Sequence, residues 1–146
     1  MKIYLAGAMT CQTYEEMNVW RVMLENKLFE TAKNHEVKLK VYNPVDYYVI
    51  EDSRAKSDAE IMDFDLDLVL GSDLIIVNTK DVLKSPGTIT ECALAWKKGI
   101  PILGFGEVPN HPWVERFFRR IDSNMDETVD YVRDFYFMWN INEKED

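Results

Sequence analysis

The sequence contains few of the residues from which proteins build metal centres and disulfide frameworks. It has two cysteines and two histidines in 146 residues. Cys11 and Cys92 form no C-x-x-C pair, and His35 and His111 lie far apart in the chain. A structural zinc site needs four closely spaced Cys or His ligands. The sequence therefore predicts no metal site and no cofactor, and two isolated thiols suit a reducing compartment.

Glycine-rich phosphate loops are also absent. Only Gly7 stands in the segment LAGAMTCQ that follows the first apolar run, so the dinucleotide fingerprint G-x-G-x-x-G is missing. No G-x-x-x-x-G-K-[ST] phosphate loop occurs elsewhere in the chain. These absences argue against a nicotinamide-dependent dehydrogenase and against a P-loop kinase.

Positive charge is scarce relative to negative charge. The chain carries 26 Asp and Glu against 17 Lys and Arg, a formal net charge of -9. Such a balance disfavours a nucleic-acid polymer or an anionic membrane as partner, whereas a small nucleotide can still be held at a helix N-terminus. No apolar run approaches the ~20 residues of a membrane span, and MKIYLAG is too short in its apolar part for a signal peptide. We expect a cytoplasmic protein.

The patterns that are present alternate between strand and helix. Apolar runs predict strands at 2–6, 36–42, 74–77 and 100–105, and helical spacing predicts helices at 13–34, 57–70, 88–98, 111–120 and 126–139. This alternation predicts a single α/β domain over residues 1–140, followed by a polar tail at 141–146. Its sheet should be open and mostly parallel, Rossmann/flavodoxin-like, with helices on both faces. Ligands of such sheets bind at the carboxyl ends of the strands, here the loops 7–12, 78–87 and 104–110.

The stretch SPGTITE lies at that edge and allows two interpretations of Glu91. Thr88 and Glu91 have the spacing of a capping box, in which each side chain binds a backbone N–H of the first helical turn. Pro86 and Gly87 would then form the turn before the helix. Alternatively, Glu91 is a functional carboxylate at the ligand-binding edge of the sheet.

Asp65 stands out from the aspartates beside it. On a helix, Asp63 and Asp67 share one solvent-facing side, whereas Asp65 falls among Ile61, Leu68 and Val69 on the apolar stripe. A carboxylate on the core side must be paired, hydrogen-bonded or protonated. Asp65 is therefore either an inward structural carboxylate or part of a functional site.

The segment containing Trp20 and Arg21, together with the aromatic residues near the C-terminal end, is assigned to the core or to a subunit interface. Base stacking is a less favoured interpretation of these side chains.

Three motifs in order resemble the nucleoside 2-deoxyribosyltransferase family, which includes related deoxynucleoside 5'-monophosphate N-hydrolases. They are IYLAG at residues 3–7, the Asp65 to Asp73 spacing followed by LIIVN, and SPGTITE opening a helix. The resemblance covers nearly the whole chain. It implies that Glu91 is a nucleophile that attacks C1' of a deoxyribosyl group, with Tyr4 hydrogen-bonded to its carboxylate and Asp65 assisting departure of the base.

The resemblance also implies the binding residues and the assembly. Gly7, Ser85 and Gly87 would bind the substrate, and Ser123, Asn124 and Met125 match a late turn that is lent to the active site of a neighbouring subunit. The protein is then expected to be a homo-oligomer with shared active sites, acting on a small nucleoside or nucleotide.

The second half of the reaction stays open at this stage. The transferases carry an aspartate where this chain has Ser85, and the hydrolases carry serine there and in the late turn, where Ser123 stands. The first loop, however, lacks the arginine of those hydrolases. The function that follows is cleavage of the N-glycosidic bond of a 2'-deoxynucleoside or its 5'-monophosphate, with transfer to another base or to water. The alternatives are a non-catalytic nucleotide-binding module and an NAD-consuming glycosidase.

Overall fold

A computed structural model describes residues 1–9, 12–47 and 57–139 of the chain. The expected tail at 141–146 and Cys11 lie outside these ranges. The elements follow in the order β1 (Lys2–Gly7), α1 (Tyr14–Asn34), β2 (Lys40–Tyr42), the 3-10 turn η1 (Pro44–Tyr47), α2 (Asp58–Leu70), β3 (Leu74–Asn78), the 3-10 turn η2 (Val82–Lys84), α3 (Pro86–Lys97), β4 (Ile102–Phe105), α4 (Pro112–Arg116), β5 (Arg120–Asp122), α5 (Met125–Val132) and the π-helix η3 (Arg133–Phe137).

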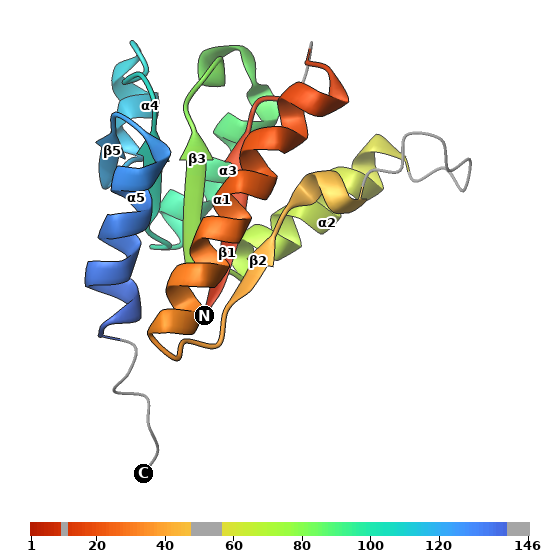
Figure 1. Cartoon of the computed structure of the whole chain (residues 1–146). Helices are drawn as coiled ribbons and strands as arrows, with labels where there is room; N and C mark the ends of the chain where they lie inside the picture. The colour runs from red at the N-terminus through yellow and green to blue at the C-terminus, as the bar shows by residue number, and fades with distance from the viewer. Residues whose placement is uncertain (10–11, 48–56, 140–146) are drawn as a thin grey trace.

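Within the described residues, five strands form one sheet in the order β2-β1-β3-β4-β5 (Figure 1). Every neighbouring pair is parallel, and β1 lies beside β3 from Ile3 to Gly7. The order reverses between β1 and β3, because the chain moves from β1 outward to β2 and then returns to the other side. This is the flavodoxin-like doubly wound arrangement. The predicted α/β fold with a parallel sheet is confirmed.

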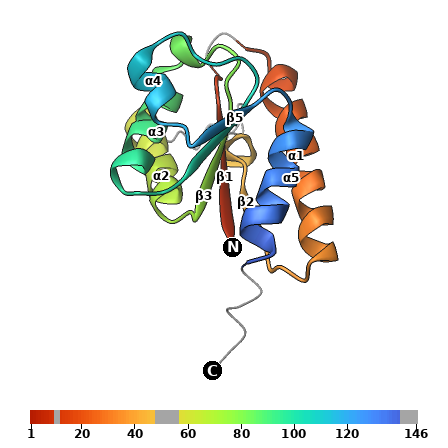
Figure 2. The same cartoon turned by 90° about the vertical axis from the view of Figure 1, so that its left-hand side faces the viewer.

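Helices cover both faces of the sheet, as Figure 2 shows with α1 and α5 on one side and α2, α3 and α4 on the other. The alternating side chains of β1 explain this division. Ile3 and Leu5 pack with α1 and α5, whereas Tyr4 and Ala6 pack with α2, α3 and α4. Tyr4 therefore points to the face on which Asp65 and Glu91 lie. No helix in the described ranges has the length and apolar character needed to cross a membrane.

The start of α3 differs from the sequence prediction. Ser85 is the N-cap residue, and its hydroxyl accepts a hydrogen bond from the N–H of Thr88 at 3.4 Å. Pro86 occupies the first turn, where its missing N–H costs nothing and its fixed φ favours a helix. Of the two interpretations of Glu91, the capping box with Thr88 is wrong, because the helix begins before these residues. Glu91 lies in the second turn, where no backbone N–H needs a cap.

This correction predicts that Ser85→Ala lowers the free energy of unfolding by about 1 kcal/mol, since an N-cap hydroxyl is lost. Thr90→Ala is the matched control, because the Thr90 hydroxyl bonds only the Pro86 carbonyl, at 2.8 Å, on the exposed side of the same helix. Urea unfolding followed by circular dichroism measures both variants. Equal stability of Ser85→Ala and wild type would contradict the assigned helix start.

Other boundaries differ where the sequence signal is short. The strand expected at 36–42 is limited to β2, and the helix expected at 111–120 ends at Arg116. The three residues of β5 were missed, since they are too few to show a period. The other strongly patterned helices are confirmed, including the cap of α2 by Ser57, whose hydroxyl accepts from the Glu60 N–H at 3.2 Å.

Candidate active site

The carboxyl ends of β1 and β3 form the point where the strand order reverses. Gly7 ends β1 and Asn78 ends β3, and the two residues are register partners. Crevices at such points are the usual ligand sites of doubly wound sheets, because the following loops diverge to opposite faces.

Three candidate catalytic side chains come from three different elements beside this edge. Glu91 is on α3, Asp65 on α2 and Tyr4 on β1, and α2 packs directly against α3. Tyr4 is completely buried, and Glu91 and Asp65 are partly buried. The Glu91 Oε2 atom is buried. The fold thus brings together the residues that the sequence predicted as the catalytic set.

These neighbours set the ionisation of Glu91. Burial raises the pKa of the Glu91 carboxyl from 4.5 to about 7, because a carboxylate is poorly solvated there. A hydrogen bond from Tyr4 lowers this pKa, the negative charge of Asp65 raises it, and the positive charge of Arg21 lowers it. A carboxyl that titrates near neutrality inside a protein is typical of acid–base or nucleophilic sites.

Asp63, Asp65 and Asp67 of α2 separate as the helical spacing predicted. Asp63 and Asp67 are exposed, whereas Asp65 turns inward and interacts electrostatically with Glu91. Asp65 also acts on Tyr47, whose pKa is raised by burial and by nearby negative charge. Tyr47 in turn contacts Phe64 with the ring centres 5.3 Å apart. Sequence reasoning missed Tyr47, which follows β2 in a short turn without a recognisable pattern.

Arg21 is a second residue whose place the sequence reasoning missed. Its side chain is completely buried, and its Nη2 donates to the Gly7 carbonyl at 3.1 Å. Met17, Arg21, Leu24 and Leu28 share one helical face, so the spacing rule that singled out Asp65 also predicts an inward Arg21.

Gly7 is confined by its neighbours. A Cβ added to Gly7 would lie 2.7 Å from the indole ring of Trp20, so the ring can reach the strand only because this residue has no side chain. The structure therefore gives Gly7 a packing role and a carbonyl that binds Arg21, and its predicted contact with substrate stays a prediction.

Ser85 and Gly87 lie at the start of α3, on the same side of the sheet as Glu91. Ser85 is buried, and its hydroxyl shares a 2.8 Å hydrogen bond with the Thr88 hydroxyl. Gly87 is exposed, with no other atom within 4 Å of an added Cβ. Gly87 therefore faces open space, whereas the Ser85 hydroxyl already has a partner within the helix cap.

The late turn lies at the start of α5. Asn124 is the N-cap residue and accepts from the Glu127 N–H at 3.0 Å, while the Ser123 hydroxyl donates to the Glu127 carboxylate at 3.2 Å. Met125 packs against the core between the sheet and α1. Within this chain these residues cap and anchor a helix on the opposite face of the sheet from Glu91.

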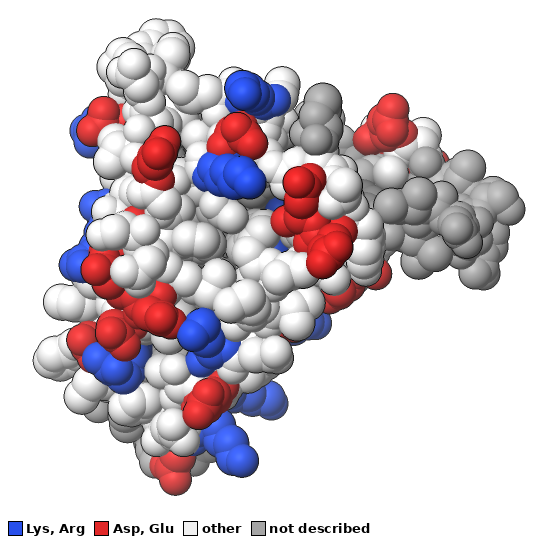
Figure 3. Space-filling model, turned by 45° about the horizontal axis from the view of Figure 1, so that its top comes forward, with Lys and Arg blue, Asp and Glu red and all other residues white. Residues whose placement is uncertain are grey.

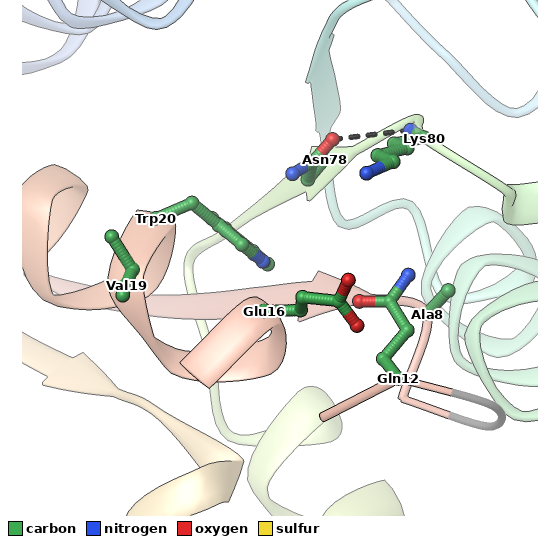
Figure 4. A pocket seen from close by; sticks show the side chains of 7 residues that line it. All are labelled: Ala8, Gln12, Glu16, Val19, Trp20, Asn78 and Lys80. Atoms are coloured by element: carbon green, nitrogen blue, oxygen red, sulfur yellow. Dashed lines mark hydrogen bonds between the residues drawn. The ribbon is translucent and has the colours of Figure 1, made fainter. Parts of the chain in front are cut away.

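A cavity of about 250 Å³ opens at the same edge, on the α1 side (Figure 4). Its lining residues are Ala8, Gln12, Glu16, Val19, Trp20, Asn78 and Lys80. The Trp20 ring and the Gln12 and Glu16 side chains point into it from α1 and the segment before α1, and Asn78 and Lys80 border it from β3 and the following loop. An indole face beside amide, carboxylate and ammonium groups suits a flat heterocycle with both donors and acceptors.

The surface around this edge carries charges of both signs, interspersed rather than gathered into one basic field (Figure 3). Such a face offers no extended attraction for a polyanion. Among the described residues, no group of three or more His, Cys, Asp and Glu side chains is placed to hold a metal ion.

Neither the family models nor the curated proteins that were searched match this sequence. Solved structures do match the fold. A conserved protein from Enterococcus faecalis superposes with a TM-score of 0.70 at 19% identity, over 91% of this chain and 97% of the other. A 2-deoxyribosyltransferase from Bacillus psychrosaccharolyticus superposes with a TM-score of 0.64 at 18% identity, over 90% and 92% of the two chains. The chain therefore has the α/β fold that this 2-deoxyribosyltransferase also has.

Proposed function

We propose that the protein cleaves the N-glycosidic bond of a 2'-deoxynucleoside or its 5'-monophosphate through a covalent intermediate on Glu91. The observation that carries this proposal is the buried Glu91 carboxyl in the second turn of α3, grouped with Tyr4 and Asp65 beside the reversal of strand order. Ser85 and not Glu91 caps the helix, so capping does not explain the inward placement of Glu91. The shared fold with a 2-deoxyribosyltransferase supports the same assignment.

In the first half-reaction, a Glu91 carboxylate oxygen forms a bond to C1' while the C1'–N bond breaks. The bonding electron pair leaves with the base, and the Asp65 carboxyl donates the proton that neutralises it. Tyr4 donates its hydroxyl hydrogen to the Glu91 carboxylate and holds it beneath the sugar. Positive charge develops on the sugar ring in such a transition state, so an adjacent carboxylate stabilises it, as in retaining glycosidases.

In the second half-reaction, a second base or a water molecule attacks C1' and Glu91 leaves as a carboxylate. Asp65 accepts the proton that the attacking group loses, which returns both carboxyls to their starting states. Transfer and hydrolysis share the covalent intermediate, so the acceptor admitted to the site decides between them.

A panel assay tests the proposal. The protein is incubated with the deoxynucleosides, their 5'-monophosphates and NAD, with and without a second free base, and released bases are separated by liquid chromatography. We expect base release from at least one deoxyribosyl substrate. Acid-quenched protein should carry a substrate-derived sugar on the peptide that contains Glu91, as seen by mass spectrometry. Binding of a nucleotide without base release would support the non-catalytic alternative instead, and cleavage of NAD alone would support the NAD-consuming one.

We further propose a homo-oligomer in which Ser123 or Asn124 completes the site of a neighbouring subunit. Mixing an Asn124→Ala chain with a Glu91→Ala chain should then restore base release, because one site of each mixed dimer keeps both residues. The loss of the Asn124 cap lowers stability by about 1 kcal/mol, so folding of each parent is checked first. Mixed oligomers that are verified by mass spectrometry and remain inactive would contradict shared sites.

A further inference from the structure

Arg21 carries a buried positive charge, whose lost hydration must be compensated by other groups of the protein. Its side chain is wholly inside the protein, although a guanidinium remains charged at any pH the protein meets. Buried charges persist in proteins only where hydrogen bonds and an opposite charge replace the lost water.

The contacts of Arg21 fix its guanidinium at the carboxyl end of β1. Nη2 donates to the Gly7 carbonyl at 3.1 Å, and Nη1 donates to the Met17 carbonyl one helical turn back. The guanidinium carbon lies 4.4 Å from the centre of the Trp20 ring, a cation–π contact. Because β2 pairs with β1 only from Lys2 to Tyr4, no described strand covers this edge of β1 at Gly7. The Arg21 guanidinium therefore lies at the carboxyl end of β1, beyond the residues that pair with β2.

The groups that act on the Glu91 carboxyl come from three elements. They are the Tyr4 hydroxyl of β1, the Asp65 carboxyl of α2 and the Arg21 guanidinium of α1. Of these three, only Arg21 is a cation. Its charge opposes the effects of burial and of Asp65, both of which favour a protonated Glu91. On α3 itself, the neighbouring Cys92 thiol has a pKa that is raised by burial and by the charge of Glu91.

We propose that Arg21 is a positioning residue, which clamps the carboxyl end of β1 and supplies the fixed positive charge that keeps the Glu91 carboxylate ready to attack C1'. This inference rests on the proposed function and adds a role for a residue on the opposite face of the sheet. Arg21 acts through Glu91 and the β1 backbone and does not touch the sugar.

The first test measures the electrostatic coupling between Arg21 and Glu91, and it needs neither substrate nor a variant of Arg21. The side-chain N–H resonances of Arg21 are followed by NMR between pH 5 and 9 in wild type and in Glu91→Gln. We expect a transition near the pKa of Glu91 in the wild type, and none in Glu91→Gln. Arg21 resonances that do not shift when Glu91 titrates would overturn the inference.

The second test removes the charge. Arg21→Met, or Arg21→Gln if the first does not fold, should move the titration of the ¹³C-labelled Glu91 carboxyl to higher pH by about 0.5 to 1 pH unit. Arg21→Lys, which keeps the cation, should shift it less. Tyr4→Phe is the positive control, since it removes another group that favours the carboxylate. Lys97→Met, at the exposed end of α3, should leave the titration unchanged.

The acid limb of kcat/KM should move with the titration, so that Arg21→Met loses more activity at pH 6 than at pH 8.5. A purely structural Arg21 would instead lower activity equally at both pH values and leave the Glu91 titration in place, which would overturn the inference. A protein that shows the NMR coupling but releases no base would overturn the proposed function alone.

Discussion

Glu91→Gln is expected to reduce base release by several orders of magnitude while the chain stays folded. The amide is nearly isosteric with the carboxyl but can neither attack C1' nor stabilise positive charge on the sugar. No covalent sugar should appear on the peptide that contains residue 91. Base release in single-turnover assays at saturating substrate measures the loss.

The free energy of unfolding of Glu91→Gln should also increase relative to that of wild type as the pH rises. Folding raises the pKa of Glu91 from 4.5 to about 7, so the native state holds a proton that the unfolded state releases between these values. The stability that this proton adds to the wild-type protein is therefore fully present below pH 4.5 and is lost as the pH rises through 7. A pKa change of this size corresponds to about 3 kcal/mol. The stability of Glu91→Gln relative to wild type should thus increase by about 3 kcal/mol between pH 4 and pH 8.

Glu115→Gln, on the exposed surface of α4, is the matched control for both measurements and should change neither activity nor its pH dependence. Unchanged turnover in Glu91→Gln would remove the nucleophile and the proposed function with it. A constant stability difference across the pH range would show that Glu91 is not held in a poorly solvated site.

The alternation of strand and helix could be read from the sequence because the core fixes it. Residues 74–77 are apolar without interruption, as expected of a strand covered on both faces, and all four are fully buried. The helix around Asp65 was likewise predicted from its apolar stripe, and its Ser57 cap is present. These features depend on local periodicity and burial, which a single sequence records directly.

The start of α3 could not be decided from the sequence, because two capping arrangements overlap there. Thr88 and Glu91 have the spacing of a capping box, yet Ser85 followed by Pro86 also begins a helix. In the structure Ser85 is the cap, and Glu91 instead interacts with Tyr4, a residue 87 positions away in the chain. A single sequence does not show which of two overlapping local signals is used, and the signal that is not used here involves the residue proposed as nucleophile.

Arg21 shows a different limit. The helical spacing that predicted an inward Asp65 applies equally to Arg21, but the segment was assigned only to the core or an interface. The spacing places the side chain inside, whereas the Glu91 carboxyl, whose pKa the Arg21 charge lowers, lies on another helix across the sheet. Periodicity can predict that a charge is buried, and only the fold can show which group it faces.

Asp65→Asn is expected to slow cleavage of ordinary deoxynucleosides by about 10²- to 10⁴-fold, the usual contribution of a general acid. The loss should depend on the leaving base. A strongly acidic heterocycle leaves the sugar as an anion and needs no protonation. The rate at which Asp65→Asn cleaves the 2'-deoxyriboside of such a heterocycle should therefore stay close to the wild-type rate. Comparing kcat for both kinds of substrate in the two proteins separates loss of proton donation from loss of binding.

The titration of Glu91 gives an independent test of the same residue. The negative charge of Asp65 raises the pKa of Glu91, so the ¹³C-labelled Glu91 carboxyl should titrate at lower pH in Asp65→Asn, opposite to the direction expected for Arg21→Met. Asp63→Asn and Asp67→Asn are the matched controls, because these carboxylates are exposed on the same helix and should affect neither the leaving-group dependence nor the Glu91 titration. An equal loss of kcat for both leaving groups, with the Glu91 titration unmoved, would show that Asp65 supports the structure of the site without giving a proton to the base.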